Sequence, residues 1–236
     1  KDQQEPDRER DVEVSVVPSL ARSHAPHDTD RRMTTTTSLP PSSSSSSWES
    51  QISSFRIETE RLTLRVLQDR DAAFIAELLN EEAFVRFIGD RGVRNEADAL
   101  KYIARQRALF IERGLGLFAV VRNDRDAVDI ETATVPIGIC GLVLRAELDG
   151  VPDIGFAFLQ RTWSYGYATE SSNAVLQDSR ERLRLPRVLA VVLPSNERSV
   201  RLLQRLGMQL ERPITLHNDE LHLYAIDLCE AAATTT

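Results

Sequence analysis

The fold is decided by two consecutive runs, Ile154-Gly-Phe-Ala-Phe-Leu159 and Trp163-Ser-Tyr-Gly-Tyr-Ala-Thr-Glu170. The first run is continuously apolar and predicts a buried strand, with Gly155 where the backbone must approach a neighbour closely. The second predicts a turn that leads into a helix. Gly166 lets another group approach the backbone of this turn closely, and the small side chain of Ala168 leaves room beside it. Free backbone N–H groups at the start of a helix attract anions. On spacing alone, a plain strand-to-helix connection with a packing glycine is an equally good interpretation.

Outward from these runs, the spacing of apolar residues predicts a mixed α/β domain. Strands are expected at residues 62–66, 117–121, 136–144, 154–159, 188–193 and 221–228. Helices are expected around residues 74–79, 95–114, 169–183 and 196–206. Asn95 and Gly114 mark the start and the end of the second helix. The order is β-α-α-β-β-β-α-β-α-β, a mixed sheet flanked by about four helices, with a polar loop at residues 122–135.

The chain begins with a segment of a different composition. Residues 1–54 are rich in Asp, Arg, Ser, Thr and Pro and poor in large apolar side chains. Such a segment cannot bury enough surface to offset the entropy of ordering, so we expect a disordered tail, with the folded domain at residues 55–230. Because Met33 is the first possible initiator, we expect residues 1–32 to be an upstream extension or a fragment end.

Bulk composition argues against several classes of partner. The 236 residues carry a net charge of -7, which disfavours nucleic acid and anionic membranes because both need clustered Lys and Arg. No run approaches the roughly 18 apolar residues that span a bilayer. The two cysteines, Cys140 and Cys229, cannot form a disulfide scaffold. A reducing, cytoplasmic location is therefore expected.

A second candidate site, Pro194-Ser-Asn-Glu-Arg-Ser199, directly follows an apolar strand. Asn196 and Ser199 lie three residues apart at a helix start, so their side chains share one face. Taken alone, this pattern is more typical of helix capping by Ser195 or Asn196. The two roles are compatible with each other.

Isolated reactive side chains carry less information. Asp153 precedes the strand that feeds the turn and is a candidate for a cleft-facing carboxylate, although a lone acid is more often solvated or a structural partner. Histidines occur only at positions 24, 27, 217 and 222, which argues against a Ser-His-Asp hydrolase and, without a Cys pair nearby, against a metal site. Cys140 lies inside an apolar strand and is expected in the core. The turn is neither a P-loop nor a dinucleotide fingerprint.

Several motifs occur in a recognisable order: Asp153-Ile-Gly-Phe-Ala-Phe-Leu159, the turn at residues 163–170, Asn196-Glu-Arg-Ser199 and Leu206-Gly-Met208. In this order they resemble the GNAT superfamily of N-acetyltransferases, and within it the RimJ/RimL-like branch. Two upstream runs are also similar to that branch, Ile57-Glu-Thr-Glu-Arg-Leu-Thr-Leu-Arg65 and Ile137-Gly-Ile-Cys-Gly-Leu142. The resemblance covers residues 55–228.

The resemblance implies a V-shaped opening between two splayed central strands, which holds the pantetheine arm of acetyl-CoA. It implies cofactor-binding roles for Phe158 and Leu159 (backbone groups on pantetheine), Tyr165, Gly166, Tyr167, Ala168 and Thr169 (around the diphosphate) and Asn196 (pantetheine region). It places Ser199 near the thioester sulfur. Ser164 and Tyr165 replace the family's usual Gly and Lys, which removes a positive charge beside the diphosphate but keeps the backbone donors.

The implied reaction is direct attack of a neutral primary amine on the acetyl thioester, without a covalent enzyme intermediate. Strand N–H groups would stabilise the oxyanion, Ser199 would protonate the thiolate, and Asp153 or an ordered water would act as base. Near neutral pH a lysine amine with a pKa of about 10.4 is about one part in a thousand neutral, whereas an α-amine with a pKa of about 7.8 is about a quarter neutral. A site without an evident histidine base therefore suits an α-amine better.

The acceptor itself is left open, as a protein N-terminus or a small-molecule amine. Residues 86–89 and 213–219 are expected to shape its pocket, where an enclosed shape would favour a small molecule and an open groove a protein N-terminus. The alternative from another class is a non-catalytic acyl-CoA-binding module, which the altered turn supports and the presence of Asn196 and Ser199 opposes. A monomer or a homodimer is expected.

Overall fold

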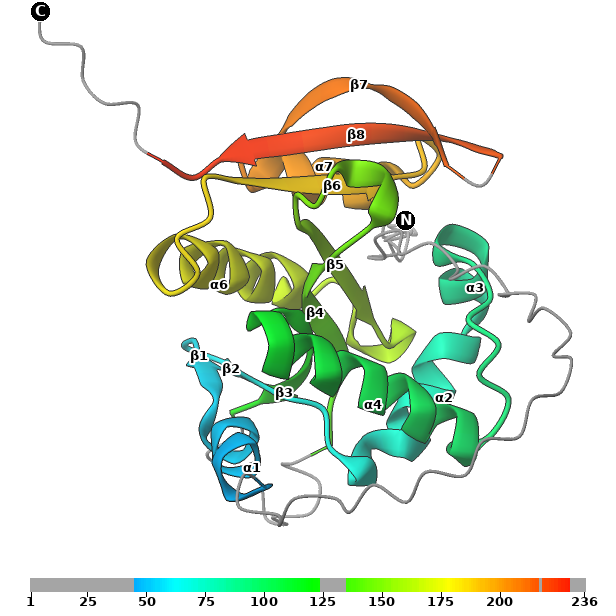
Figure 1. Ribbon diagram of the computed structural model, residues 1–236. Coiled ribbons are helices and arrows are strands. Elements are labelled where there is room, and N and C mark those ends of the chain that lie inside the picture. The colour runs from blue at the N-terminus through cyan, green and yellow to red at the C-terminus, as the bar shows by residue number, and fades with distance from the viewer. Residues whose placement is uncertain (1–44, 124–134, 217, 230–236) are drawn as a thin grey trace, which may run out of the picture.

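The computed structural model describes residues 45–123, 135–216 and 218–229. Its centre is an eight-stranded sheet with the order β1-β2-β3-β4-β5-β6-β8-β7 (Figure 1). The strands are β1 (Arg56–Glu58), β2 (Leu62–Arg65), β3 (Gly116–Arg122), β4 (Gly138–Val143), β5 (Asp153–Phe158), β6 (Arg187–Val192), β7 (Gln209–Leu216) and β8 (Asp219–Asp227). All neighbours are antiparallel except β5 and β6, so the sheet is mixed and mostly antiparallel, as predicted.

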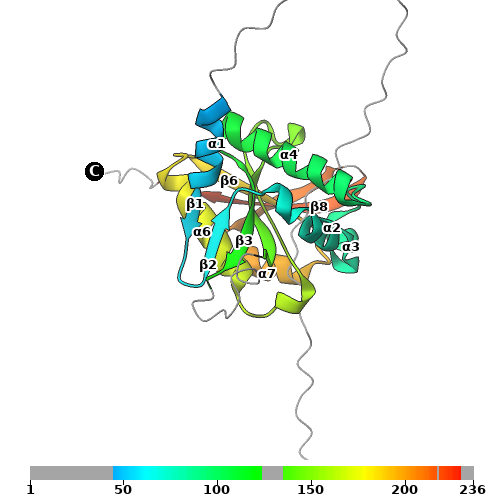
Figure 2. The same cartoon turned by 90° about the horizontal axis from the view of Figure 1, so that it is seen from below.

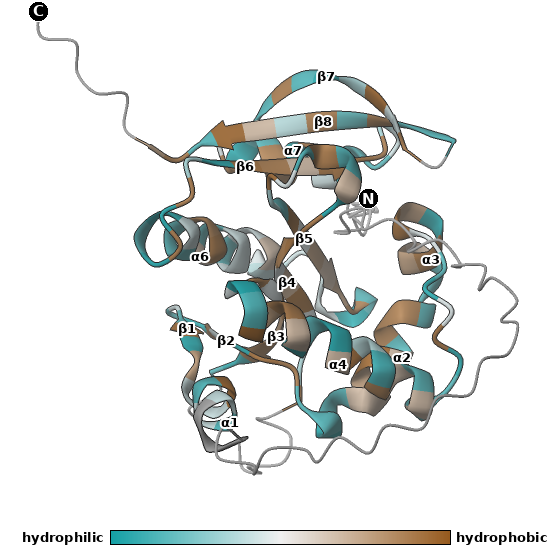
Figure 3. Cartoon of the chain, viewed as in Figure 1, coloured by the Kyte–Doolittle hydropathy of each residue, from teal (hydrophilic) through white to brown (hydrophobic). Residues whose placement is uncertain are grey.

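Six helices flank the sheet in the described part of the chain: α1 (Ser45–Ser54), α2 (Ala72–Asn80), α3 (Glu82–Ile88), α4 (Glu96–Arg113), α6 (Tyr167–Glu181) and α7 (Glu197–Arg205). Seen from below, α1 and α4 lie on one side of the sheet and α6 and α7 on the other (Figure 2). Apolar side chains of the helices and of the central strands pack into one buried core. The central strands β3, β4 and β5 are mostly apolar (Figure 3). The buried side chains thus form layers on both faces of the sheet.

The two central strands are splayed. β5 and β6 run parallel but share one register pair, Asp153 with Leu189, and the N–H of Leu189 donates to the carbonyl of Pro152 at 3.0 Å. Beyond that pair the two strands diverge (Figure 1). The divergence confirms the predicted opening, and it leaves one side of β5 without a partner strand.

Local signals in the sequence explain where α4 begins and ends. The side chain of Asn95 accepts a hydrogen bond from the N–H of Asp98 at 3.0 Å, which satisfies one of the free donors of the first turn. At the other end, Gly114 adopts φ 70°, a left-handed conformation that glycine takes at little cost. Both predicted boundaries of this helix are confirmed.

Four elements differ from the prediction, and one of them is the three-residue strand β1, which was not expected. Helix α1 occupies the last ten residues of the segment expected to be disordered, because Ile52 packs against the core. The short α3 was not expected either, and with α1 it brings the described residues to six helices rather than about four. Strand β7 was not expected because it is an edge strand, mostly exposed, with Pro213 and a bulge within it, so it lacks a buried apolar pattern.

Two further expectations fall on residues outside the described part of the chain: the disordered tail as far as residue 44, and most of the polar loop, residues 124–134. Within the described residues, every helix is too short or too polar to cross a lipid bilayer.

Candidate active site

The turn before α6 presents a row of free backbone donors. Gly166 has φ 80° and precedes the first helical residue, Tyr167. From Gly166 onward, the first N–H to find an acceptor among the described residues is that of Glu170, which donates to the carbonyl of Gly166 at 3.0 Å. The N–H groups from Gly166 to Thr169 have no acceptor among the described residues. A diphosphate fits this arrangement, because anions bind where such donors and the positive end of the helix dipole coincide.

Space above the turn is also suitable. A Cβ atom built on Gly166 would meet only the guanidinium of Arg61 within 4 Å, at 3.6 Å. Ala168 is buried and small, and Tyr165 is 61% exposed beside it. Of the five residues predicted to surround the diphosphate, Tyr165 to Thr169, only Ala168 is fully buried.

Trp163 ties this turn to the end of β5. Its buried indole Nε1–H donates to the carbonyl of Phe158 at 2.7 Å. The N–H of Leu159 donates to the carbonyl of Ile137 at 3.0 Å, on the β4 side. Two of the backbone groups that the sequence assigned to pantetheine are thus engaged within the protein.

The open side of β5 offers other groups. Alternate residues of a strand direct their N–H and C=O groups to opposite sides. The N–H of Leu159 bonds toward β4, and the carbonyl of Pro152 bonds toward β6. The even-numbered residues between them therefore face β6, so the N–H and C=O of Phe156 and the N–H of Phe158 point toward β6. Phe156 has no β6 partner in the register. Sequence reasoning missed Phe156, which only strand parity identifies.

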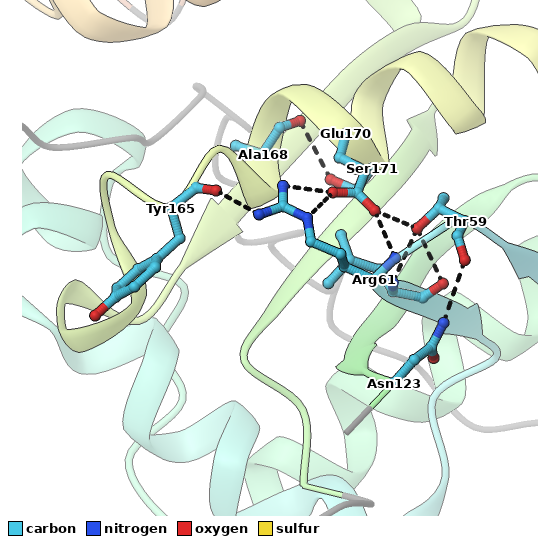
Figure 4. A network of polar contacts seen from close by, with 8 residues as sticks. Thr59, Arg61, Asn123, Tyr165, Ala168, Glu170 and Ser171 are labelled. Atoms are coloured by element: carbon cyan, nitrogen blue, oxygen red, sulfur yellow. Dashed lines mark hydrogen bonds and ion pairs between the residues drawn. The ribbon is translucent and has the colours of Figure 1, made fainter. Parts of the chain in front are cut away.

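A polar network fixes the turn from a distant part of the chain (Figure 4). Arg61, in the connection between β1 and β2, donates from Nε to Glu170 at 2.7 Å and from Nη1 to the carbonyl of Tyr165 at 3.0 Å. The Thr59 hydroxyl and the Arg61 N–H donate to the other carboxylate oxygen of Glu170 at 2.6 and 2.9 Å. Burial alone would raise the pKa of Glu170, but these hydrogen bonds lower it. The guanidinium also lies 5.1 Å from the ring centre of Tyr167.

Helix α7 starts beside β6 with both predicted polar residues buried. The side chain of Asn196 accepts a hydrogen bond from the N–H of Ser199 at 3.2 Å, so Asn196 caps the helix as the simpler interpretation proposed. Ser199 is wholly buried at the third position of the helix. The structure therefore brings these two residues together, as the spacing predicts.

Asp153 lies away from this group. It stands at the closed end of the β5–β6 pair, with no exposed surface. Arg145 contacts the Oδ2 atom of Asp153 from Nε at 2.8 Å and from Nη2 at 2.7 Å. Burial raises the pKa of Asp153, and Arg145 opposes that rise. These surroundings are those of a structural ion pair, and the role of base stays a prediction.

Other reactive groups behave as expected for a structural core. Cys140 is buried, and burial raises the pKa of its thiol to about 11, which makes a thiolate nucleophile unfavourable. No three His, Cys, Asp or Glu side chains gather into a possible metal site in the residues that the structure describes. The sequence did not predict the two ion pairs. Arg61, noted only within a motif, pairs with Glu170 far along the sequence, and Arg145 pairs with Asp153 across a loop.

The chain resembles bacterial acetyltransferases in sequence. It matches the acetyltransferase (GNAT) domain family over residues 61–209. It is 26% identical over 172 residues to the Bacillus subtilis protein YkkB, covering 72% of this chain and 94% of that protein. It is 29% identical over 155 residues to the Bacillus subtilis N-acetyltransferase YoaA, covering 66% and 83%.

Solved structures share the fold. A ribosomal-protein-S5-alanine acetyltransferase from Vibrio fischeri superposes with a TM-score of 0.60 at 18% identity, covering 73% of this chain and 96% of that one. The microcin C7 self-immunity acetyltransferase MccE, solved with acetyl-CoA and AMP, superposes with a TM-score of 0.60 at 15% identity, covering 72% and 93%. Since the family match spans more than half of the chain, this protein belongs to the GNAT family and is an acetyltransferase.

Proposed function

We propose that this enzyme transfers the acetyl group of acetyl-CoA to a primary amine by direct attack. The observation that carries the proposal is the row of free N–H groups at the start of α6, next to the open side of β5. The solved complex of MccE with acetyl-CoA, which has the same fold, supports acetyl-CoA as the donor. Membership of the family speaks against a non-catalytic acyl-CoA-binding module.

The turn and β5 would hold the donor together. Tyr165, Gly166, Tyr167, Ala168 and Thr169 would surround the diphosphate, mainly through backbone N–H groups. The pantetheine arm would lie along the open side of β5, where Phe156 and the N–H of Phe158 supply backbone groups in place of Leu159. Asn196 would border that arm from α7.

The chemistry needs few side chains. Acetyl-CoA, when bound, supplies an activated thioester. Backbone N–H groups on the open side of β5 would stabilise the negative charge that develops on the carbonyl oxygen. Ser199 would deliver a proton to the departing sulfur, a transfer worth about 10²–10⁴ in rate. Since Asp153 is buried against Arg145, an ordered water is the better base for a weakly basic amine.

The acceptor is proposed to be an α-amine, of a protein N-terminus or of a small molecule. A hollow of about 550 Å³ lies where β6 ends, lined by Pro194 and by the β7–β8 hairpin, including Pro213 and His222. The hollow is lined in part by residues 213–215, which belong to the segment 213–219 that was expected to shape the acceptor pocket. Its volume suits a small molecule or the terminal residue of a protein. Similarity in fold to the ribosomal-protein-S5-alanine acetyltransferase supports the proposal of a RimJ/RimL-like enzyme, and the cytoplasmic location stays a prediction.

Release of free thiol tests the proposal. Purified protein is mixed with acetyl-CoA and, separately, with peptides bearing free α-amines, blocked peptides with one lysine, and small amines. We expect thiol release with α-amines and little with lysine, because a lysine amine is about 3.5 kcal/mol harder to deprotonate than an α-amine. Ser199→Ala should lower turnover by about 10²-fold at unchanged CoA affinity. CoA binding without thiol release from any acceptor would contradict catalysis. A Ser199→Ala variant with the turnover of the unmodified protein would show that Ser199 has no part in the mechanism.

A further inference from the structure

The peptide that joins Tyr165 to Gly166 is the point where the diphosphate site can fail. In a trans peptide the C=O and the N–H point in opposite directions, so fixing one fixes the other. Gly166 has φ 80°, and a glycine can accept either sign of φ. Type I and type II turns differ in this way: the peptide before the third residue is flipped, and glycine at that residue accepts both forms. Such a flip would replace an N–H donor by a carbonyl oxygen, whose partial negative charge repels a phosphate.

Arg61 blocks that flip. Its Nη1–H donates to the carbonyl of Tyr165 at 3.0 Å, which holds the oxygen toward the β1–β2 connection (Figure 4). Its Nε–H and Nη2–H both contact Oε2 of Glu170, at 2.7 and 2.6 Å, in the first turn of α6. One planar guanidinium thus holds the residue before Gly166 and the helix after it in a fixed relation.

The anchor of Arg61 is itself held in place. Thr59 donates to the carboxylate of Glu170 at 2.6 Å and receives the N–H of Leu62 at 2.9 Å. Asn123, at the end of β3, donates to the carbonyl of Thr59 at 3.3 Å. The clamp therefore starts from the sheet and reaches the turn across 109 residues of sequence.

We propose that Arg61 is a positioning residue of the donor site, which keeps the Tyr165–Gly166 peptide in the orientation that presents its N–H, and those of the first turn of α6, to the diphosphate of acetyl-CoA. The inference rests on the proposed function. Arg61 acts through the backbone, and Glu170 neutralises its charge, so the fork of the guanidinium matters more than its charge.

Loss of the clamp lowers the fraction of molecules with a competent turn. The apparent dissociation constant rises by the inverse of that fraction, so a turn that is competent in one molecule of ten binds tenfold more weakly. For Arg61→Ala we expect CoA affinity to fall roughly tenfold. Arg61→Lys keeps the charge but cannot bridge Tyr165 and Glu170 as a fork does, so we expect an intermediate loss.

Arg182, the residue that caps the C-terminus of the same helix, provides a matched control. It contacts Asp178 at 2.6 Å, the carbonyl of Gly114 at 3.0 Å and the ring of Phe55 at 4.9 Å, at the opposite end of α6. It therefore has the same three kinds of contact as Arg61: a carboxylate, a carbonyl and an aromatic ring. Arg182→Ala should leave CoA affinity within about twofold of that of the original protein.

Calorimetric titration with CoA and with pantetheine, which lacks the diphosphate, tests the inference. Melting temperatures are measured for every variant, and Arg61→Lys decides if Arg61→Ala does not fold. We expect the Arg61 variants to lose affinity for CoA and to keep their affinity for pantetheine. Unchanged CoA affinity, an equal loss for both ligands, or an equal loss in Arg182→Ala would overturn the role of Arg61. If the unmodified protein binds no CoA, the proposed function fails instead.

Discussion

At the scale of single residues, Asp153 shows how surroundings decide the role of a carboxylate. It is buried and doubly contacted by Arg145. Phe158 lies five positions further along β5, which at about 3.3 Å per residue is roughly 16 Å. A group so placed stabilises the apex of the splayed strands and has no evident path to an acceptor amine.

The ion pair gives a prediction that separates the two roles. Asp153→Asn removes the carboxylate charge that Arg145 contacts from two nitrogens in the buried core, so we expect a loss of about 3 kcal/mol in the free energy of unfolding, measured by urea denaturation. Replacing both residues, Arg145→Met with Asp153→Leu, should restore most of that stability. A single variant of unchanged stability whose turnover falls at least a hundredfold would instead make Asp153 the base.

At the scale of elements, the proposed donor site depends on the start of α6. There, the left-handed Gly166, free backbone N–H groups and the contacts of Arg61 with Tyr165 and Glu170 come together. Gly166→Ala should cost about 1 kcal/mol of stability, since a Cβ is disfavoured at φ 80°. It should also weaken CoA binding, because relief of the strain moves the turn away from its competent shape.

Gly150 is the control for that variant. Its φ of 77° is nearly the same, and no atom lies within 4 Å of the position of its Cβ. Gly150→Ala should therefore lose similar stability in thermal melts while keeping CoA affinity. If both variants bind CoA like the unmodified protein, the conformation of Gly166 does not shape the donor site.

At the scale of the whole molecule, local patterns predicted the central strands and the long helices. The capped α4 and the strand-turn-helix from β5 to α6 carry strong local signals, and both are present. The edge strand β7 and the helix α1 were missed because most of the side chains described in them are exposed, so neither has a repeating buried pattern. Contacts between distant residues, such as Arg61 with Glu170, leave no local signal at all.

The same distinction holds for the site. Spacing predicted that Asn196 and Ser199 come together, because both lie on one helix turn. It did not predict that Trp163 donates a hydrogen bond to the carbonyl of Phe158. With that carbonyl occupied, the N–H and C=O of Phe156 are groups of β5 that face the opening without a partner in β6. Such details depend on strand parity and on the sheet partner, which become visible only in three dimensions.

In the proposed complex, the donor's diphosphate lies on the first turn of α6 and its pantetheine arm along the open side of β5. Titration of CoA into ¹⁵N-labelled protein, followed through the backbone amide resonances, tests this claim directly. We predict that the largest shifts belong to the amides of Gly166, Ala168, Thr169 and Phe156, while Arg145 and Asp153 move little. Saturable binding that shifts other amides and leaves those of Gly166 to Thr169 unmoved would contradict the account.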